Sequence, residues 1–126
     1  MATKIPKKKP DYSVFIRLIE MRGMPHPDLE LEFAKDIKRK WRFDLAWTEQ
    51  MVALEIEGGL WNYGRHNRPV GMMKDMDKYN EAASRGWLVL RFPVEKLMSQ
   101  ETMDTIKRTL ELRSKLGDDP VQGVCH

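Results

Sequence analysis

The sequence lacks a second cysteine and lacks any long apolar run, and each of these absences excludes a class of protein. Cys125 is the only cysteine among 126 residues, so no intramolecular disulfide can form and a reducing, cytoplasmic setting is permitted. No apolar run reaches the ~18 residues that are needed to span a bilayer. The basic first residues lack the apolar segment of a secretory signal, so we do not expect secretion.

Length and composition indicate one globular domain. A chain of 126 residues is long enough for one core, and 41% hydrophobic with 33% charged residues is ordinary for such a domain. We expect a disordered basic arm at residues 1–10, a single domain at residues 11–116 and a loose polar tail at residues 117–126. The arm either lies on DNA or only solubilises the chain, and its composition leaves both open.

The net charge is only +3, but one short segment concentrates the cations. Asp36 is the single acid within it, and its cations are Lys35, Lys38, Arg39, Lys40 and Arg42. Clustered cations suit a polyanion, and nucleic acid is a common polyanion inside cells. The alternative is a basic surface that serves only solubility.

Three strands are predicted in the first half of the chain. Alternation of apolar and polar residues indicates strands at residues 29–33 and 41–47, and a short apolar run indicates a third at residues 51–56. A short polar turn joins the last two into a hairpin. In that hairpin Asp44 would lie opposite Glu55, across one strand spacing of roughly 5 Å.

Three carboxylates, Asp44, Glu55 and Glu57, lie inside these apolar runs, which normally exclude charge because an unpaired buried carboxylate is costly. Glu55 and Glu57 are two residues apart in a strand, so both point to the same face. Converging carboxylates suit a hard divalent cation, Mg²⁺ or Mn²⁺. The alternative is that these acids pair with Arg42 or Lys40 on a solvated face.

The remaining elements are predicted as three helices and one strand. Helices are indicated at residues 11–21, 72–85 and 99–116, and residues 87–92 indicate a strand that is apolar at nearly every position and hence central. The strand–helix–strand order favours a parallel crossover. The middle helix carries an apolar stripe, namely Met72, Met76, Tyr79 and Ala83. Lys78 lies beside the stripe, on a solvated face or directed toward the sheet edge.

Residues 58–71 are rich in glycine, asparagine and arginine, which is typical of a loop. The loop contains Trp61, Arg65, His66 and Arg68, and aromatics interleaved with cations suit phosphate contacts and base stacking. A packing role for Trp61 is an equal alternative. A lone histidine is more often structural, but a few residues beyond a carboxylate strand His66 suits proton transfer or phosphate binding.

These motifs resemble the PD-(D/E)XK nuclease superfamily, and most of all its small phage and mobile-element endonucleases. That branch is similar to very-short-patch repair endonucleases and Holliday junction resolvases. The resemblance covers residues 23–91, and the residues that carry it are Phe43–Asp44, Glu55–Gly58, Trp61 and Gly64–His66. One residue departs from the pattern, because Glu57 occupies the position of the usual motif lysine.

The resemblance implies a restriction-endonuclease-like α/β core, with the order α-β-β-β-α-β-α and helices flanking a mixed central sheet. It implies hydrolysis of DNA phosphodiesters with Mg²⁺ or Mn²⁺, held by Asp44, Glu55 and the backbone carbonyl of Ile56. Glu57 would bind a second ion or act as general base through a water. Lys78, Arg65 or His66 would supply the missing positive charge. The DNA-contacting residues would be Lys38, Arg39, Lys40, Arg42, Trp61, Arg65, His66 and Arg68.

The small size of the chain favours recognition of DNA shape, as in a junction resolvase acting as a homodimer in a bacterial or phage-infected cell. A mismatch-nicking enzyme of the very-short-patch repair type would act as a monomer. An inert DNA-binding module of the same fold and an RNA-directed nuclease are further alternatives. We expect DNA as the partner, with no membrane and no nucleotide cofactor.

Overall fold

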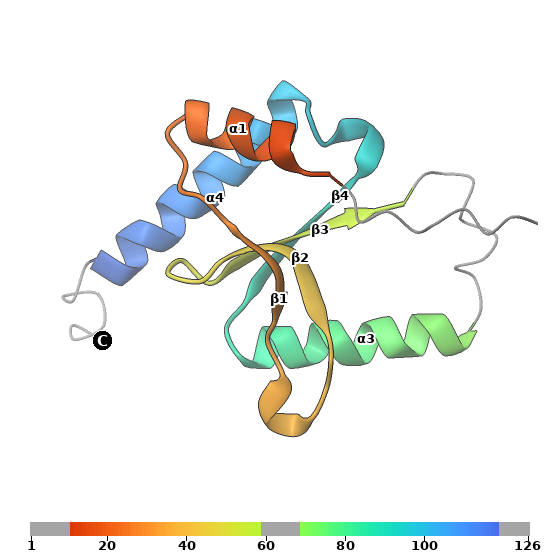
Figure 1. Ribbon diagram of the computed structural model, residues 1–126. Helices are drawn as coiled ribbons and strands as arrows, with labels where there is room; N and C mark the ends of the chain where they lie inside the picture. Colours follow the sequence, from red (N-terminus) through yellow and green to blue (C-terminus); the bar gives the residue numbers. More distant parts are fainter. Residues whose placement is uncertain (1–10, 59–68, 119–126) are drawn as a thin grey trace, which may run out of the picture.

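The computed structural model describes residues 11–58 and 69–118 and has an α/β architecture with a four-stranded mixed sheet (Figure 1). The elements in order are α1 (Ser13–Met21), β1 (Asp28–Glu32), η1 (Lys35–Ile37), β2 (Arg42–Trp47), β3 (Val52–Glu57), α3 (Pro69–Ser84), β4 (Leu88–Pro93), η3 (Val94–Lys96) and α4 (Gln100–Asp118). The predicted α/β class is confirmed. The observed order differs from the predicted one by the two short 3-10 helices η1 and η3, which serve as connectors between longer elements.

The sheet has the strand order β1-β2-β3-β4, with antiparallel pairing between the first three strands and parallel pairing between β3 and β4. The predicted antiparallel strands and the parallel return are therefore confirmed. The prediction that the fourth strand is central is wrong, because β4 lies at the edge. Its apolar residues are explained by helices on both of its faces: Leu90 and Phe92 pack on one side and Val89 on the other.

Helices α1 and α4 cover one face of the sheet and α3 covers the other (Figure 1). The larger core lies under α1 and α4, where it includes Ile19, Leu54 and Ile106. The second core lies under α3 and continues toward the β1–β2 connection, with Phe33, Phe43 and Trp87 as its large members. Among the described residues, no helix is both long enough and apolar enough to cross a membrane.

The apolar stripe predicted on α3 is wrong. Met76 is 56% exposed and Ala83 is also exposed, whereas Ala82 is fully buried. Ala82 faces Ala46 and Ala53 of the sheet in the same core, so small side chains let the helix approach closely. Lys78 precedes Ala82 by four residues and therefore lies on the same, inward face of the helix.

Helix α4 (Gln100–Asp118) lies where the sequence predicts a helix, at residues 99–116. The Thr102 N–H donates to Ser99 Oγ at 3.2 Å, which is an N-cap contact. The inward positions Met103, Ile106 and Leu110 are buried. Helix α4 thereby closes the face of the sheet that is opposite α3.

Candidate active site

The β2–β3 hairpin brings Asp44 and Glu55 together. The observed register pairs Leu45 with Leu54, and one further step places Asp44 opposite Glu55. At this position the two carboxylate side chains accept hydrogen bonds from backbone N–H groups of the neighbouring strand. The Asp44 N–H donates to Glu55 Oε2 at 3.0 Å, and the Ile56 N–H donates to Asp44 Oδ2 at 2.7 Å. Each carboxylate therefore accepts a hydrogen bond from a backbone N–H of the other strand.

Helix α3 supplies the other partners of Glu55. Lys78 Nζ forms an ion pair and hydrogen bond with Glu55 Oε1. The Tyr79 hydroxyl donates to the same oxygen at 3.1 Å. Glu55 is only 6% exposed, so its charge depends on these donors instead of on water.

The Asp44 carboxyl is easier to protonate than an ordinary aspartate. Burial raises its pKa from 3.8 to about 6, against the opposing effect of the hydrogen bond from the Ile56 N–H. The neighbouring Glu55 carboxylate raises the pKa further, and the charge of Lys78 lowers it. The site therefore holds two adjacent carboxylates and one ammonium group, with more negative than positive charge.

Arg91 pairs with the third acid of the motif. Arg91 Nε and Nη2 both lie 2.6 Å from Glu57 Oε1. The guanidinium also lies over the Tyr79 ring, 4.5 Å from its centroid. Arg91 stands beside Glu55 in the parallel register of β3 and β4. Both partners of this pair are about half exposed, whereas Glu55 is buried and Asp44 is partly buried.

Sequence reasoning missed Tyr79 and Arg91 as polar members of this site. Arg91 did leave a signal, because it is the one charged residue in the apolar run of β4. Tyr12 and Glu30 were missed as well: burial raises the pKa of Tyr12 to about 12, with contributions from the charges of Asp44, Glu30 and Glu55. Glu30 has a positive φ of 49°, which departs from regular strand geometry opposite Asp44.

Glu55 and Glu57 pair with cations outside the basic segment. Within the described residues, Glu55 contacts Lys78 and Glu57 contacts Arg91, and neither Lys40 nor Arg42 is a partner. Lys40 and Arg42 are exposed. The interpretation that these acids form surface pairs with the basic segment is therefore wrong.

The basic segment lies at the β1–β2 connection, and all its cations are exposed. Arg39 lies over the Trp41 ring at 4.8 Å from its centroid. Lys38 ends η1 in a left-handed conformation with φ 60°. The predicted site residues Trp61, Arg65, His66 and Arg68 lie outside the described residues.

The Asp44–Glu55 pair fits a hard divalent cation by the chemistry of its donors. Two adjacent carboxylates suit Mg²⁺ or Mn²⁺, and Mg²⁺ usually binds one or two carboxylates and keeps several waters. In the two described ranges, no group of three His, Cys, Asp or Glu side chains is placed to hold a metal. The pair is therefore the core of the candidate site, and Glu57 is held apart by Arg91.

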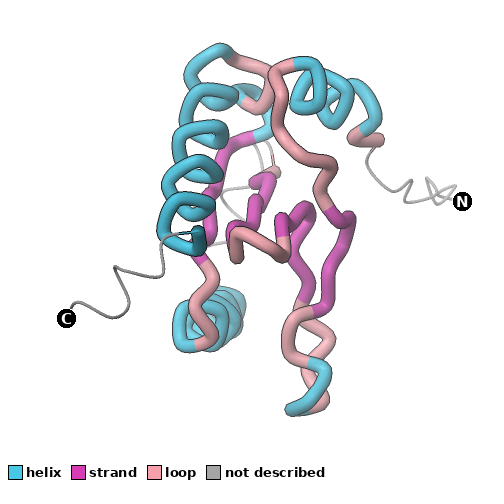
Figure 2. The backbone as a smooth tube through the Cα atoms, turned by 90° about the vertical axis from the view of Figure 1, so that its left-hand side faces the viewer, coloured by secondary structure: helices cyan, strands magenta, loops and turns pink. Residues whose placement is uncertain are grey.

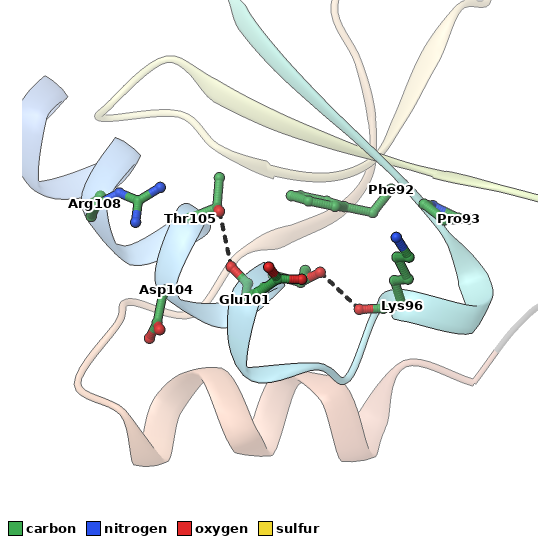
Figure 3. Close-up of a pocket in the computed structure, with 8 residues that line it drawn as sticks. Phe92, Pro93, Lys96, Glu101, Asp104, Thr105 and Arg108 are labelled. Carbon is green, nitrogen blue, oxygen red and sulfur yellow. Dashed lines mark hydrogen bonds between the residues drawn. The ribbon is translucent and has the colours of Figure 1, made fainter.

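A separate pocket of about 430 Å³ lies between the end of β4 and the first turns of α4 (Figure 3). Phe92 and Arg108 line it, and in the figure the Phe92 ring points toward Thr105. Phe92 belongs to the core under α1 and α4, whereas its neighbour Arg91 pairs with Glu57. Because neighbouring strand residues point to opposite faces, this pocket is not part of the carboxylate site.

Comparison with known proteins gives few relatives. No family model matches the sequence, and no solved structure matches it. Matching curated proteins include the uncharacterized proteins MT2308 and Rv2248, from two strains of Mycobacterium tuberculosis. Each is 27% identical over 73 residues, which cover 58% of this chain and 26% of the relative. The match thus spans about a quarter of the length of these relatives.

Proposed function

We propose that this protein is a metal-dependent endonuclease that hydrolyses DNA phosphodiester bonds. The observation that carries the proposal is the contact of Lys78 with Glu55, which is itself interlocked with Asp44 on the adjacent strand. Two carboxylates on adjacent strands and one lysine are the residue types that PD-(D/E)XK chemistry uses. Here the lysine comes from a helix instead of from the strand.

Each residue has a defined task in this proposal. Mg²⁺ or Mn²⁺ bound to Asp44 and Glu55, with the Ile56 carbonyl, would acidify a water and offset charge on the phosphate. Lys78 contributes a positive charge beside Glu55, at the position where negative charge builds during cleavage. Glu57, held through Oε1 by Arg91, serves as general base through a water or as ligand of a second ion.

The proposed substrate is branched DNA, and the proposed active form is a homodimer. The basic segment offers exposed cations for phosphate contacts, and phosphate contacts carry no sequence information, which favours recognition of DNA shape. A four-way junction must be nicked symmetrically, and a two-fold dimer presents two equivalent sites. A mismatch-nicking enzyme is the competing proposal, and it needs only a monomer.

A second candidate is an inert DNA-binding module of the same fold. Its support is that Glu57 replaces the motif lysine and that Lys78 and Tyr79 already engage Glu55 Oε1. This candidate retains DNA binding but predicts no cleavage in any divalent metal.

Incubation with Mn²⁺ or Mg²⁺ and a panel of linear, nicked, mismatched and four-way DNA tests the proposal. We expect cleavage that is greatest on the four-way junction and is abolished by EDTA. RNA versions of the same substrates separate the RNA-directed alternative, and sedimentation with junction DNA measures the dimer. DNA binding without cleavage under all metals would favour the inert module.

A further inference from the structure

The β1–β2 connection protrudes from the body of the protein. In both views it extends past α3 and away from the rest of the described chain (Figures 1 and 2). Helix η1 lies at its tip. Ile37 in this helix is 46% exposed, and the tip is therefore both apolar and surrounded by cations.

Arg85, the residue directly after α3, braces this hairpin. The Arg85 guanidinium donates to Asp36 Oδ1 at 2.8 Å and to Asp36 Oδ2 at 3.0 Å, and it also donates to the Phe33 carbonyl at 3.0 Å. Hydrogen bonding to Arg85 is the main reason that the pKa of Asp36 is lowered. Asp36, the single acid of the basic segment, is thus paired with Arg85. Its negative charge is therefore not spent on the exposed cations of the segment.

Stacked aromatic rings support the base of the hairpin. Phe33 and Phe43 stack with centroids 4.2 Å apart, and Phe43 packs against Trp87 at 5.0 Å. Arg39 lies on the Trp41 ring, which itself stacks with Phe33. These contacts tie both ends of the connection to the core under α3, so the tip is held in a defined orientation.

A single exposed isoleucine is ordinary on a protein surface. An isoleucine at the end of a braced projection, flanked by cations, matches the requirements of a DNA wedge instead. Proteins that kink DNA insert apolar side chains between base steps while neighbouring cations hold the phosphates. Unstacking is cheaper at a branch point or mismatch, where a base has already lost partners.

We propose that the hairpin tip is a wedge that selects DNA with an unstacked base step, with Ile37 entering the step and Lys38, Arg39 and Lys40 binding the flanking phosphates. This inference rests on the proposed function only in requiring DNA as the substrate. It assigns shape recognition to the hairpin and leaves the chemistry to the carboxylate site. It also explains why the lone acid of the segment faces Arg85.

The test is binding, in EDTA, to a four-way junction and to a linear duplex of the same sequence, each with 2-aminopurine at the central step. Wild-type protein should raise the fluorescence of the junction as the base unstacks. Ile37→Ala should lower junction affinity by about tenfold or more and remove the rise, with duplex affinity changed by less than about twofold.

Two further variants separate the wedge from general effects. Leu112→Ala removes an apolar side chain that is 56% exposed on α4, and it should leave both affinities unchanged. Lys38→Gly removes a cation at a left-handed position that glycine adopts without strain. It should weaken junction and duplex binding alike and lower the salt slope by about one unit.

The outcomes distinguish the wedge from the nuclease. If Ile37→Ala binds and unstacks the junction like wild type, the wedge is refuted while the nuclease proposal is untouched. If Ile37→Ala loses junction selectivity and the wild-type protein never cleaves, the wedge holds and the nuclease proposal fails. Wild-type protein that binds no DNA would overturn both.

Discussion

Lys78 of α3 contacts Oε1 of Glu55 across the face of the sheet, and Glu55 is the most buried acid among the described residues. The strand position two residues after Glu55, which holds a lysine in the PD-(D/E)XK pattern that the sequence resembles, is Glu57 here. The cation beside Glu55 therefore comes from helix α3, and in the proposed nuclease it takes the place of the strand lysine. This relationship links the fold to the proposed chemistry, because α3 approaches the sheet through Ala82.

Replacing Lys78 should slow cleavage while DNA binding is kept. We expect Lys78→Ala to lose roughly a hundredfold in single-turnover rate at saturating metal, the usual scale for one such group. Arg65→Ala and His66→Ala are measured beside it because the loop could supply the same charge. Three variants that cut at the wild-type rate would contradict this account and indicate a second metal ion held by Glu57.

Loss of Lys78 also leaves Glu55 without its cation, so stability has to be followed in the same samples. Removing one partner of a buried ion pair destabilises a protein by about 3–5 kcal/mol. Lys78→Arg keeps the charge and is the matched control for folding. Rates are compared below the melting temperature of the weakest variant, where thermal unfolding shows that each variant is folded.

The free energy of unfolding should depend on pH in the way that the raised pKa of Asp44 predicts. Its pKa is raised from 3.8 to about 6 in the folded protein, so between these values the folded state binds more protons than the unfolded state. The contribution of Asp44 to the free energy of unfolding is then present at low pH and is lost as pH rises through about 6.

Asp44→Asn removes this titration and keeps an oxygen acceptor for the Ile56 N–H. Its melting temperature in EDTA should exceed that of wild type by roughly 3 °C near neutral pH and should match it at about pH 4 or below. Asp77→Asn, at an exposed position of α3, is the control. An Asp44→Asn difference that is the same at every pH would show that Asp44 titrates normally.

Glu57→Gln separates a chemical role from a structural one. The Glu57–Arg91 pair is about half exposed, and such pairs contribute about 0–1 kcal/mol to stability. We expect little change in unfolding but a loss of about a hundredfold in single-turnover cleavage, the lower end of the range for losing a general base. Arg91→Ala is measured in parallel, because a rate that falls equally in both variants would assign Glu57 only to orienting Arg91.

Neutralising Lys38, Arg39 and Lys40 together should weaken binding to every DNA substrate. Each lost phosphate contact should flatten the dependence of log affinity on log salt by about one unit. A triple variant of Lys107, Arg108 and Lys115, all exposed on α4, removes the same three charges and provides the matched control. An unchanged salt slope would show that the basic segment does not touch the DNA backbone.

Much of the sheet and part of the site follow from the sequence alone. The run around Asp44 alternates, and the run around Glu55 is short and apolar, so pairing them predicts that the two acids face each other. The observed hydrogen bonds between their side chains and the partner strand agree with that pairing. Local periodicity carries this information because a strand has a fixed two-residue repeat.

The orientation of α3 and the position of β4 did not follow from the sequence. Methionines at helical spacing suggested an inward stripe, yet Ala82 faces the sheet because the opposing Ala46 and Ala53 are small. The apolar β4 suggested a central strand, yet helices on both faces of an edge strand create the same pattern. Both errors concern tertiary packing, which the periodicity of one segment does not encode.

The most direct test of the nuclease proposal is single-turnover cleavage of a four-way junction in Mn²⁺ by wild-type protein and by Asp44→Asn. Asn keeps the shape of the side chain and removes the charge that would bind metal. We predict cleavage by wild type, a loss of at least about a hundredfold in the variant, and junction affinity that is unchanged or tighter. Cutting by Asp44→Asn at nearly the wild-type rate would contradict the account, since Asp44 would then have no part in the chemistry.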